Sequence, residues 1–247
     1  MELSREKSPA PGFRRLAFGS MFSRPAATLD SLSGRPRWFL PLLLAATYSV
    51  AVNYFVVRRI GLVRLMGAAL QVNTAIDPQA LLENAVAHKT EILFFQGLAT
   101  FAGTLVTAFV VAKVLWLIIT VIGQDVHFKK VLAVVAHVTM LTVVVRESML
   151  ALTATAMRNL DNLDLRNPLA TNLAFFLHPR SPIASNLLGS LDLITLANIF
   201  LLALGLSKVS NRLSFRAACI LVIVPWGVYV GVSFLLPTFF WQSGSPG

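Results

Sequence analysis

Long stretches of apolar residues, separated by short polar segments, dominate the pattern along this chain. Each stretch is close to or above the roughly 20 residues that a helix needs to cross a hydrocarbon core about 30 Å thick. A strand of a membrane β-barrel would instead alternate apolar and polar residues over about ten positions. The pattern therefore predicts an all-α, polytopic helical membrane protein with about five transmembrane helices, at Trp38–Val57, Ile92–Ile122, Val131–Met157, Ser185–Leu206 and Ala217–Leu236.

The composition supports this interpretation. Hydrophobic residues make up 56% of the 247 positions and charged residues only 13%, against about 25% charged residues in an average soluble domain. The one cysteine, Cys219, lies in the last apolar stretch. A single cysteine gives no intramolecular disulfide and no cysteine-based metal site.

The first 37 residues differ from the rest because they are polar, basic and rich in proline. Apolar residues such as Phe13, Leu16, Met21 and Phe22 recur there at loosely helical spacing. This favours one or two short helices at the membrane surface, with a disordered tail as the alternative. Three parts are predicted: a basic cytoplasmic arm with an interfacial helix (1–37), a five-span membrane domain (38–236) and a short C-terminal tail (237–247).

The formal net charge of +10 indicates how the protein is oriented in the membrane rather than that it binds nucleic acid. Basic residues cluster in the arm and in the turns near Lys129 and Arg212, and loops rich in Lys and Arg stay on the cytoplasmic side of a membrane. We therefore expect a cytoplasmic N-terminus and an outer C-terminus. Nucleic acid is not expected as a partner, because no basic helix or aromatic-rich module accompanies the charge. The lipid bilayer is the expected surrounding.

No segment of the chain has the pattern of an enzyme active site. The HExxH, P-loop and GxSxG signatures are missing, and the four histidines, His88, His127, His137 and His178, have no metal-ligand spacing. We predict no catalytic residues, no metal site and no cofactor.

Three short motifs follow one another in a definite order. The entry to the first stretch contains Phe22-Ser23-Arg24-Pro25 and Arg35-Pro36-Arg37-Trp38, and the turn before the third contains Gly123 and Phe128-Lys129-Lys130. The fourth stretch begins with Leu191-Asp192-Leu193 and ends with Ala203-Leu204-Gly205-Leu206. Together, over about residues 18 to 236, these motifs resemble the Yip-domain family of Ypt/Rab-interacting membrane proteins, and specifically its bacterial branch. The chain departs from the family's glycine pair, because Ile122 precedes Gly123.

The resemblance implies a five-span fold with a cytoplasmic N-terminus and no enzymatic activity. In eukaryotes this family is linked to vesicle trafficking and small GTPases. It therefore suggests a scaffold or adaptor in membrane organisation or trafficking, in the bacterial cell (inner) membrane. Another membrane protein, a small-GTPase-like protein or a second copy of the chain are the partners that it leaves open.

Asp192 and Arg146 are the charged residues that stand out within the apolar stretches. A charged side chain at the centre of a bilayer costs about 2.5–3.5 kcal/mol on insertion scales, and the spacing puts both residues in the outer third of the bilayer. We predict that they face each other as an intramembrane polar pair. The alternative for Asp192 is that its carboxylate caps the first turn of its helix. A small transporter or channel subunit that uses this pair is the alternative function.

Other residues within the stretches favour roles in packing. Gly227 and Gly231 form a small-xxx-small face, either for internal packing or for a dimer, and Asn198 is predicted to make an interhelical hydrogen bond. His137 is predicted to be satisfied within a packed interface, and Lys113 to reach the inner headgroups.

Overall fold

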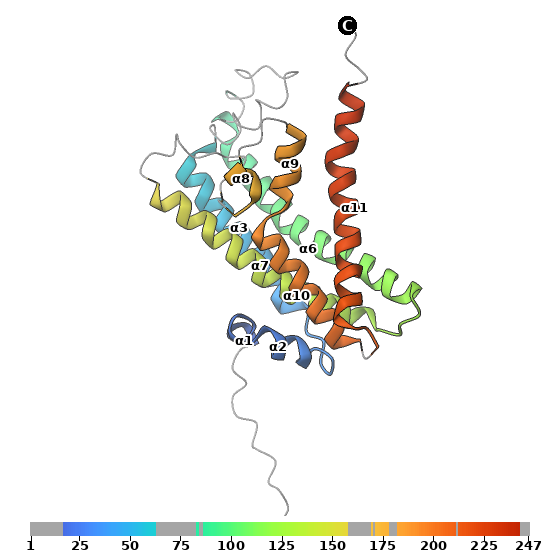
Figure 1. Ribbon diagram of the computed structural model, residues 1–247. Coiled ribbons are helices and arrows are strands. Elements are labelled where there is room, and N and C mark those ends of the chain that lie inside the picture. The colour runs from blue at the N-terminus through green and yellow to red at the C-terminus, as the bar shows by residue number, and fades with distance from the viewer. Residues whose placement is uncertain are drawn as a thin grey trace, which may run out of the picture.

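The computed structural model describes residues 17–62, 83, 86–157, 169, 171–177, 182–210 and 212–242. Within these ranges the regular elements are helices, with one isolated β-bridge between Asn172 and Asp192 (Figure 1). The helices are α1 (Ala17–Ser23), α2 (Pro25–Ser31), α3 (Phe39–Ile60), α6 (Lys89–Val121), α7 (Phe128–Ala156), α8 (Leu173–Leu177), α9 (Pro182–Ser190), α10 (Leu193–Val209) and α11 (Phe215–Gln242).

Four of these helices, α3, α6, α7 and α11, are long and apolar enough to cross a membrane. The fifth, α10, is apolar but has 17 residues, about 26 Å at 1.5 Å per residue. The prediction of an all-α polytopic membrane protein is confirmed. The long stretch from Ile92 to Ile122 is a single helix, as its length suggested, because α6 extends over 33 residues.

The fourth predicted span is wrong in one respect, because it is not continuous from Ser185. The chain breaks between α9 and α10, where Asp192 has an extended backbone with φ −100° and ψ 138°. A neighbouring segment satisfies the backbone at the break: Leu193 N–H donates to Thr171 O at 3.0 Å and Leu173 N–H to Leu191 O at 3.4 Å. This pairing satisfies backbone groups that the interruption would otherwise leave unpaired, which is costly wherever water is excluded.

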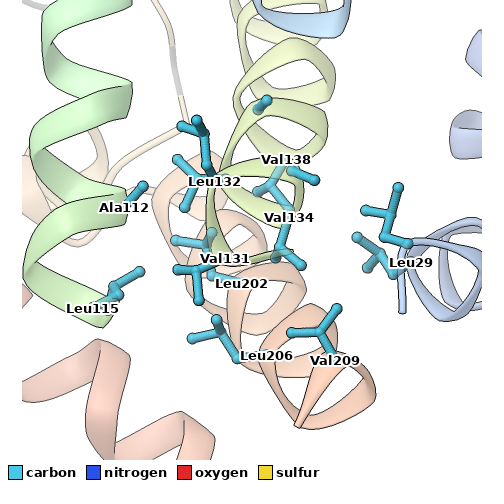
Figure 2. Packing of buried hydrophobic residues seen from close by; sticks show 14 of the residues in the cluster. Leu29, Ala112, Leu115, Val131, Leu132, Val134, Val138, Leu202, Leu206 and Val209 are labelled. Carbon is cyan, nitrogen blue, oxygen red and sulfur yellow. The ribbon is translucent and has the colours of Figure 1, made fainter. Parts of the chain in front are cut away.

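The hydrophobic core is centred on the first half of α7 (Figure 2). Val131, Val134 and Val138 are fully buried, and the core also includes Leu115 of α6 and Leu206 of α10. Every residue from 131 to 138 is buried, because α7 is surrounded here by α3, α6 and α10.

The described part of the N-terminal arm belongs to this core. Met21 of α1 and Leu29 of α2 are both 0% exposed and lie in the same cluster. Figure 2 shows Leu29 beside Val134 and Val138. Residues 17–23 and 25–31 are thus helical rather than a disordered tail, and α1 and α2 are anchored to α7 and α10 by buried side chains. The arm before residue 17 lies outside the described residues.

Gly205 explains how α2, α7 and α10 come so close together. A Cβ atom added at this position would collide with the Val134 side chain and lie 3.2 Å from Leu29 Cδ2. Gly205 is therefore the residue of α10 against which the other two helices pack.

Candidate functional site

A cavity of about 700 Å³ lies within the helical bundle, a volume typical of small-molecule sites. We call it the intramembrane cavity. Four helices, α6, α7, α10 and α11, supply nearly all of its walls, and α3 contributes Ser49. Its polar lining residues are Ser49, Thr104, Thr107, Thr139, Thr142, Arg146, Glu147, Thr195, Asn198 and Tyr229.

The intramembrane cavity has a polar end and an apolar end. Along α7 the lining residues Val135, Thr139, Thr142 and Arg146 lie on one helix face, because residues three and four apart are neighbours on a helix. From Val135 to Arg146 the cavity therefore extends for about 16 Å at 1.5 Å per residue. The lining residues Leu115, Val135, Leu202 and Val222 also belong to the core cluster, and we call their part of the cavity the apolar end. We call the part around Arg146 and Glu147 the polar end.

Arg146 and Glu147 are the charged residues of the polar end. Within the described ranges, the one contact under 4 Å between a basic nitrogen and a carboxylate joins His88 Nδ1 to Glu91 Oε2, at 3.2 Å near the start of α6. Neither Arg146 nor Glu147 forms an ion pair or hydrogen bond with a described residue. Glu147 interacts electrostatically with the adjacent Arg146, but neither group has a hydrogen-bond partner among the described residues. Their hydrogen-bonding capacity is therefore available to water or to a ligand.

Two threonines at the polar end present hydrogen-bond acceptors. Thr104 donates its hydroxyl proton to Thr100 O at 2.9 Å and Thr142 donates to Val138 O at 2.8 Å. A hydroxyl whose proton is used in this way still has a lone pair that accepts. The polar end thus offers acceptors on Thr104, Thr142 and Glu147 and donors on Arg146.

Asp192 lies outside the intramembrane cavity. Its side chain accepts from Ile194 N–H at 3.3 Å, and it is the N-cap residue of α10. The structure does not join it to Arg146, since no ion pair between these two described residues forms. The physical reason is local: the carboxylate already partners the free N–H of the first helical turn, which was the capping alternative.

The other residues singled out in the sequence have different surroundings. Asn198 lines the intramembrane cavity and makes no hydrogen bond to a described side chain or backbone group. An added Cβ at Gly227 or Gly231 would meet nothing within 4 Å, so neither glycine is in a close helix contact within the described chain. His137 is 3% exposed and its Nδ1 is 2.8 Å from Ala133 O.

Lys113 extends toward the turn between α6 and α7. Its Nζ lies 4.2 Å from the Trp116 ring centre and 5.6 Å from that of Phe128. Trp116 is held in turn by donation of its Nε1–H to Val126 O at 2.9 Å. Lys113 is not among the cavity-lining residues. It lies eight residues before the end of α6, and a lysine that extends over aromatic rings toward the end of its helix agrees with a side chain that reaches the headgroups.

A second surface stands out at the end of the bundle where α3 begins and α10 ends (Figure 1). Exposed basic residues gather there from the arm and from the two turns; we call this the basic end: Arg24, Arg35, Arg37, Lys129, Lys208, Arg212 and Arg216. Asp30 and Asp125 are the exposed acids beside them. Sequence reasoning found these basic residues but not the buried contacts of the neighbouring α2.

In the described part of the chain, no three His, Cys, Asp or Glu side chains are close enough to hold a metal ion. The fold, the intramembrane cavity and the basic end therefore define the chain as a multi-pass helical membrane protein. The model of the Yip1 domain matches residues 18–236, and the chain belongs to this family. No significant match was found among curated proteins or among solved structures. Family membership agrees with the resemblance of the motifs, and members of this family are generally non-enzymatic.

Proposed function

We propose that this Yip1-domain protein is a non-enzymatic scaffold or adaptor in membrane organisation or trafficking, and that the basic end is the surface that its partner contacts. The anchoring of α1 and α2 carries this proposal. Met21 and Leu29 are fully buried, and Leu29 lies against Gly205 of α10. The helix α2, which Arg24 precedes, is therefore fixed against the helix that carries the exposed Lys208. A fixed array of positive charge favours an acidic protein surface and speeds the encounter with it.

The charge distribution also supports an orientation. Basic segments remain on the cytoplasmic side during insertion, so the basic end and the N-terminus are proposed to face the cytoplasm, in the bacterial cell (inner) membrane. A membrane protein or a small-GTPase-like protein with an acidic surface fits this end, and self-association is the third form of partner.

In-membrane crosslinking followed by affinity purification and mass spectrometry tests the proposal. Deleting the arm is a poor test, because it removes Met21 and Leu29 from the core. The better variant is Arg24→Gln/Arg35→Gln, since both side chains are exposed. The matched control is Arg58→Gln/Lys89→Gln, which removes two exposed charges elsewhere.

We expect a stoichiometric partner with the wild type and the control, and its loss with Arg24→Gln/Arg35→Gln. Recovery of the same partner with all three proteins would contradict the role of the basic end. A preparation that contains only self-crosslinks would contradict the adaptor function.

A small transporter or channel subunit is the second candidate, and the polar lining of the intramembrane cavity favours it. Asp192 caps α10 and does not line the cavity, so this candidate depends on Arg146 and Glu147 instead. Ion flux into liposomes that contain the purified chain tests it. Flux that Glu147→Gln abolishes is the supporting result, and the absence of flux excludes it.

A further inference from the structure

We propose that the intramembrane cavity binds an aminophospholipid with a zwitterionic headgroup. In this site the lipid phosphate contacts Arg146, the ammonium group contacts Glu147, and the first part of one acyl chain occupies the apolar end. This inference is independent of the adaptor function.

The first argument is the match between the cavity and an amphiphile. Polar residues line one end and Leu115, Val135, Leu202 and Val222 line the other, over about 16 Å along α7. A soluble polar ligand would leave the apolar end filled with unfavourable water, and a purely apolar ligand would leave two charges unsolvated. A membrane lipid has both parts and is present at high concentration around the protein.

The second argument is the charge at the polar end. Arg146 and Glu147 are neighbours of opposite charge type that interact electrostatically, and neither forms an ion pair within 4 Å or a hydrogen bond with a described residue. A guanidinium binds a phosphate through two parallel hydrogen bonds. A carboxylate beside it would repel a purely anionic headgroup, but it favours a headgroup that carries an ammonium next to its phosphate. The pair of charges therefore selects a zwitterion over an anion.

The third argument is the supply of acceptors. Thr104 and Thr142 direct their hydroxyl protons to backbone carbonyls and so present lone pairs to the cavity. A primary ammonium has three N–H donors, which Glu147 and such hydroxyls can accept. A quaternary ammonium has no N–H donor, so the site should prefer an ethanolamine headgroup to a choline headgroup.

The test measures lipid binding to the purified full-length chain in detergent by native mass spectrometry. The probes are dioleoyl phosphatidylethanolamine, its phosphatidylcholine and phosphatidylglycerol counterparts, and free phosphoethanolamine. For the wild type we expect one tightly bound ethanolamine lipid, preferred about tenfold over the other two lipids. Free phosphoethanolamine should bind far more weakly, because it cannot fill the apolar end.

Two variants separate the roles of the charges. Glu147→Gln should weaken binding of the ethanolamine lipid about tenfold. Its affinity for phosphatidylglycerol should stay the same or increase. Arg146→Gln should weaken the binding of all three phospholipids by a similar factor. Glu91→Gln and Arg58→Gln, which remove exposed charges outside the cavity, are the matched controls and should bind like the wild type.

Three outcomes would overturn the proposal: equal binding of the three lipids by the wild type, the same loss for every lipid with Glu147→Gln, or free phosphoethanolamine binding as tightly as the lipid. If Arg146→Gln does not fold, as seen by its thermal unfolding, the change of lipid preference in Glu147→Gln still decides between the outcomes.

Discussion

The two halves of α7 differ in their packing although they belong to one helix. Residues 131–138 are all buried, whereas residues 141–150 are all partly or fully exposed. The first half is enclosed by neighbouring helices, including α2 from the arm. The second half lines the intramembrane cavity with Thr142, Arg146 and Glu147. The comparison teaches that the small apolar residues of the first half allow close helix contact, whereas the polar residues of the second half border open space.

The largest expected effect is on the tightly packed half. Leu29→Asp removes a fully buried side chain and places a carboxylate in an apolar core. We expect a loss of about 3 kcal/mol or more in the free energy of unfolding and release of α1 and α2. Thermal unfolding in detergent and limited proteolysis of the arm measure this. Ala27→Asp, on the exposed side of α2, is the control, and equal damage from both changes would refute the anchoring role of Leu29.

A smaller effect on stability is expected from alanine substitutions at two glycines, and it should differ in sign between them. Gly205→Ala forces a Cβ against Val134 and Leu29, and such overpacking costs about 1–3 kcal/mol. Gly103→Ala, at the cavity, meets nothing within 4 Å and should instead gain about 0.5–1 kcal/mol, because alanine stabilises a helix relative to glycine. Thermal unfolding of the two variants checks the sign. A stabilised Gly205→Ala would mean that α2, α7 and α10 are not tightly packed there.

Capping at Asp192 should give an effect of about 1 kcal/mol. Asp192→Ala removes the acceptor for Ile194 N–H, whereas Asp192→Asn keeps an oxygen in the same place. We expect Asp192→Ala to lower thermal stability and Asp192→Asn to retain most of it. If Asp192→Asn is as damaging as Asp192→Ala, the negative charge itself is required and the capping explanation fails.

The smallest effect concerns the polar contact between α3 and the open half of α7. Tyr48 Oη and Ser148 Oγ are 2.7 Å apart, and interhelical hydrogen bonds in membrane proteins contribute about 0.6 kcal/mol on average. A double-mutant cycle with Tyr48→Phe and Ser148→Ala should give a coupling energy of this size. A coupling energy of zero would show that the two hydroxyls do not stabilise the pairing of α3 with α7.

The prediction of candidate residues was less successful than the prediction of helices. Asp192 and Arg146 were singled out as costly charges, and their predicted pairing depended on an uninterrupted fourth span. The break at Asp192 directs its carboxylate to Ile194 N–H instead. Gly205, at the closest helix contact, carries no local signal that distinguishes it from Gly227, which has open space around it.

The sequence by itself determined the membrane class, the positions of most helices and the location of the basic residues. These depend on local hydropathy, because a helix in lipid satisfies its own backbone hydrogen bonds. Only the tertiary structure decided that Leu29 completes the core, that Gly205 is the point of closest approach, and that ten polar side chains from five helices border one cavity. These features join residues far apart in the chain, and helices in lipid associate through shape and polar contacts that hydropathy does not encode.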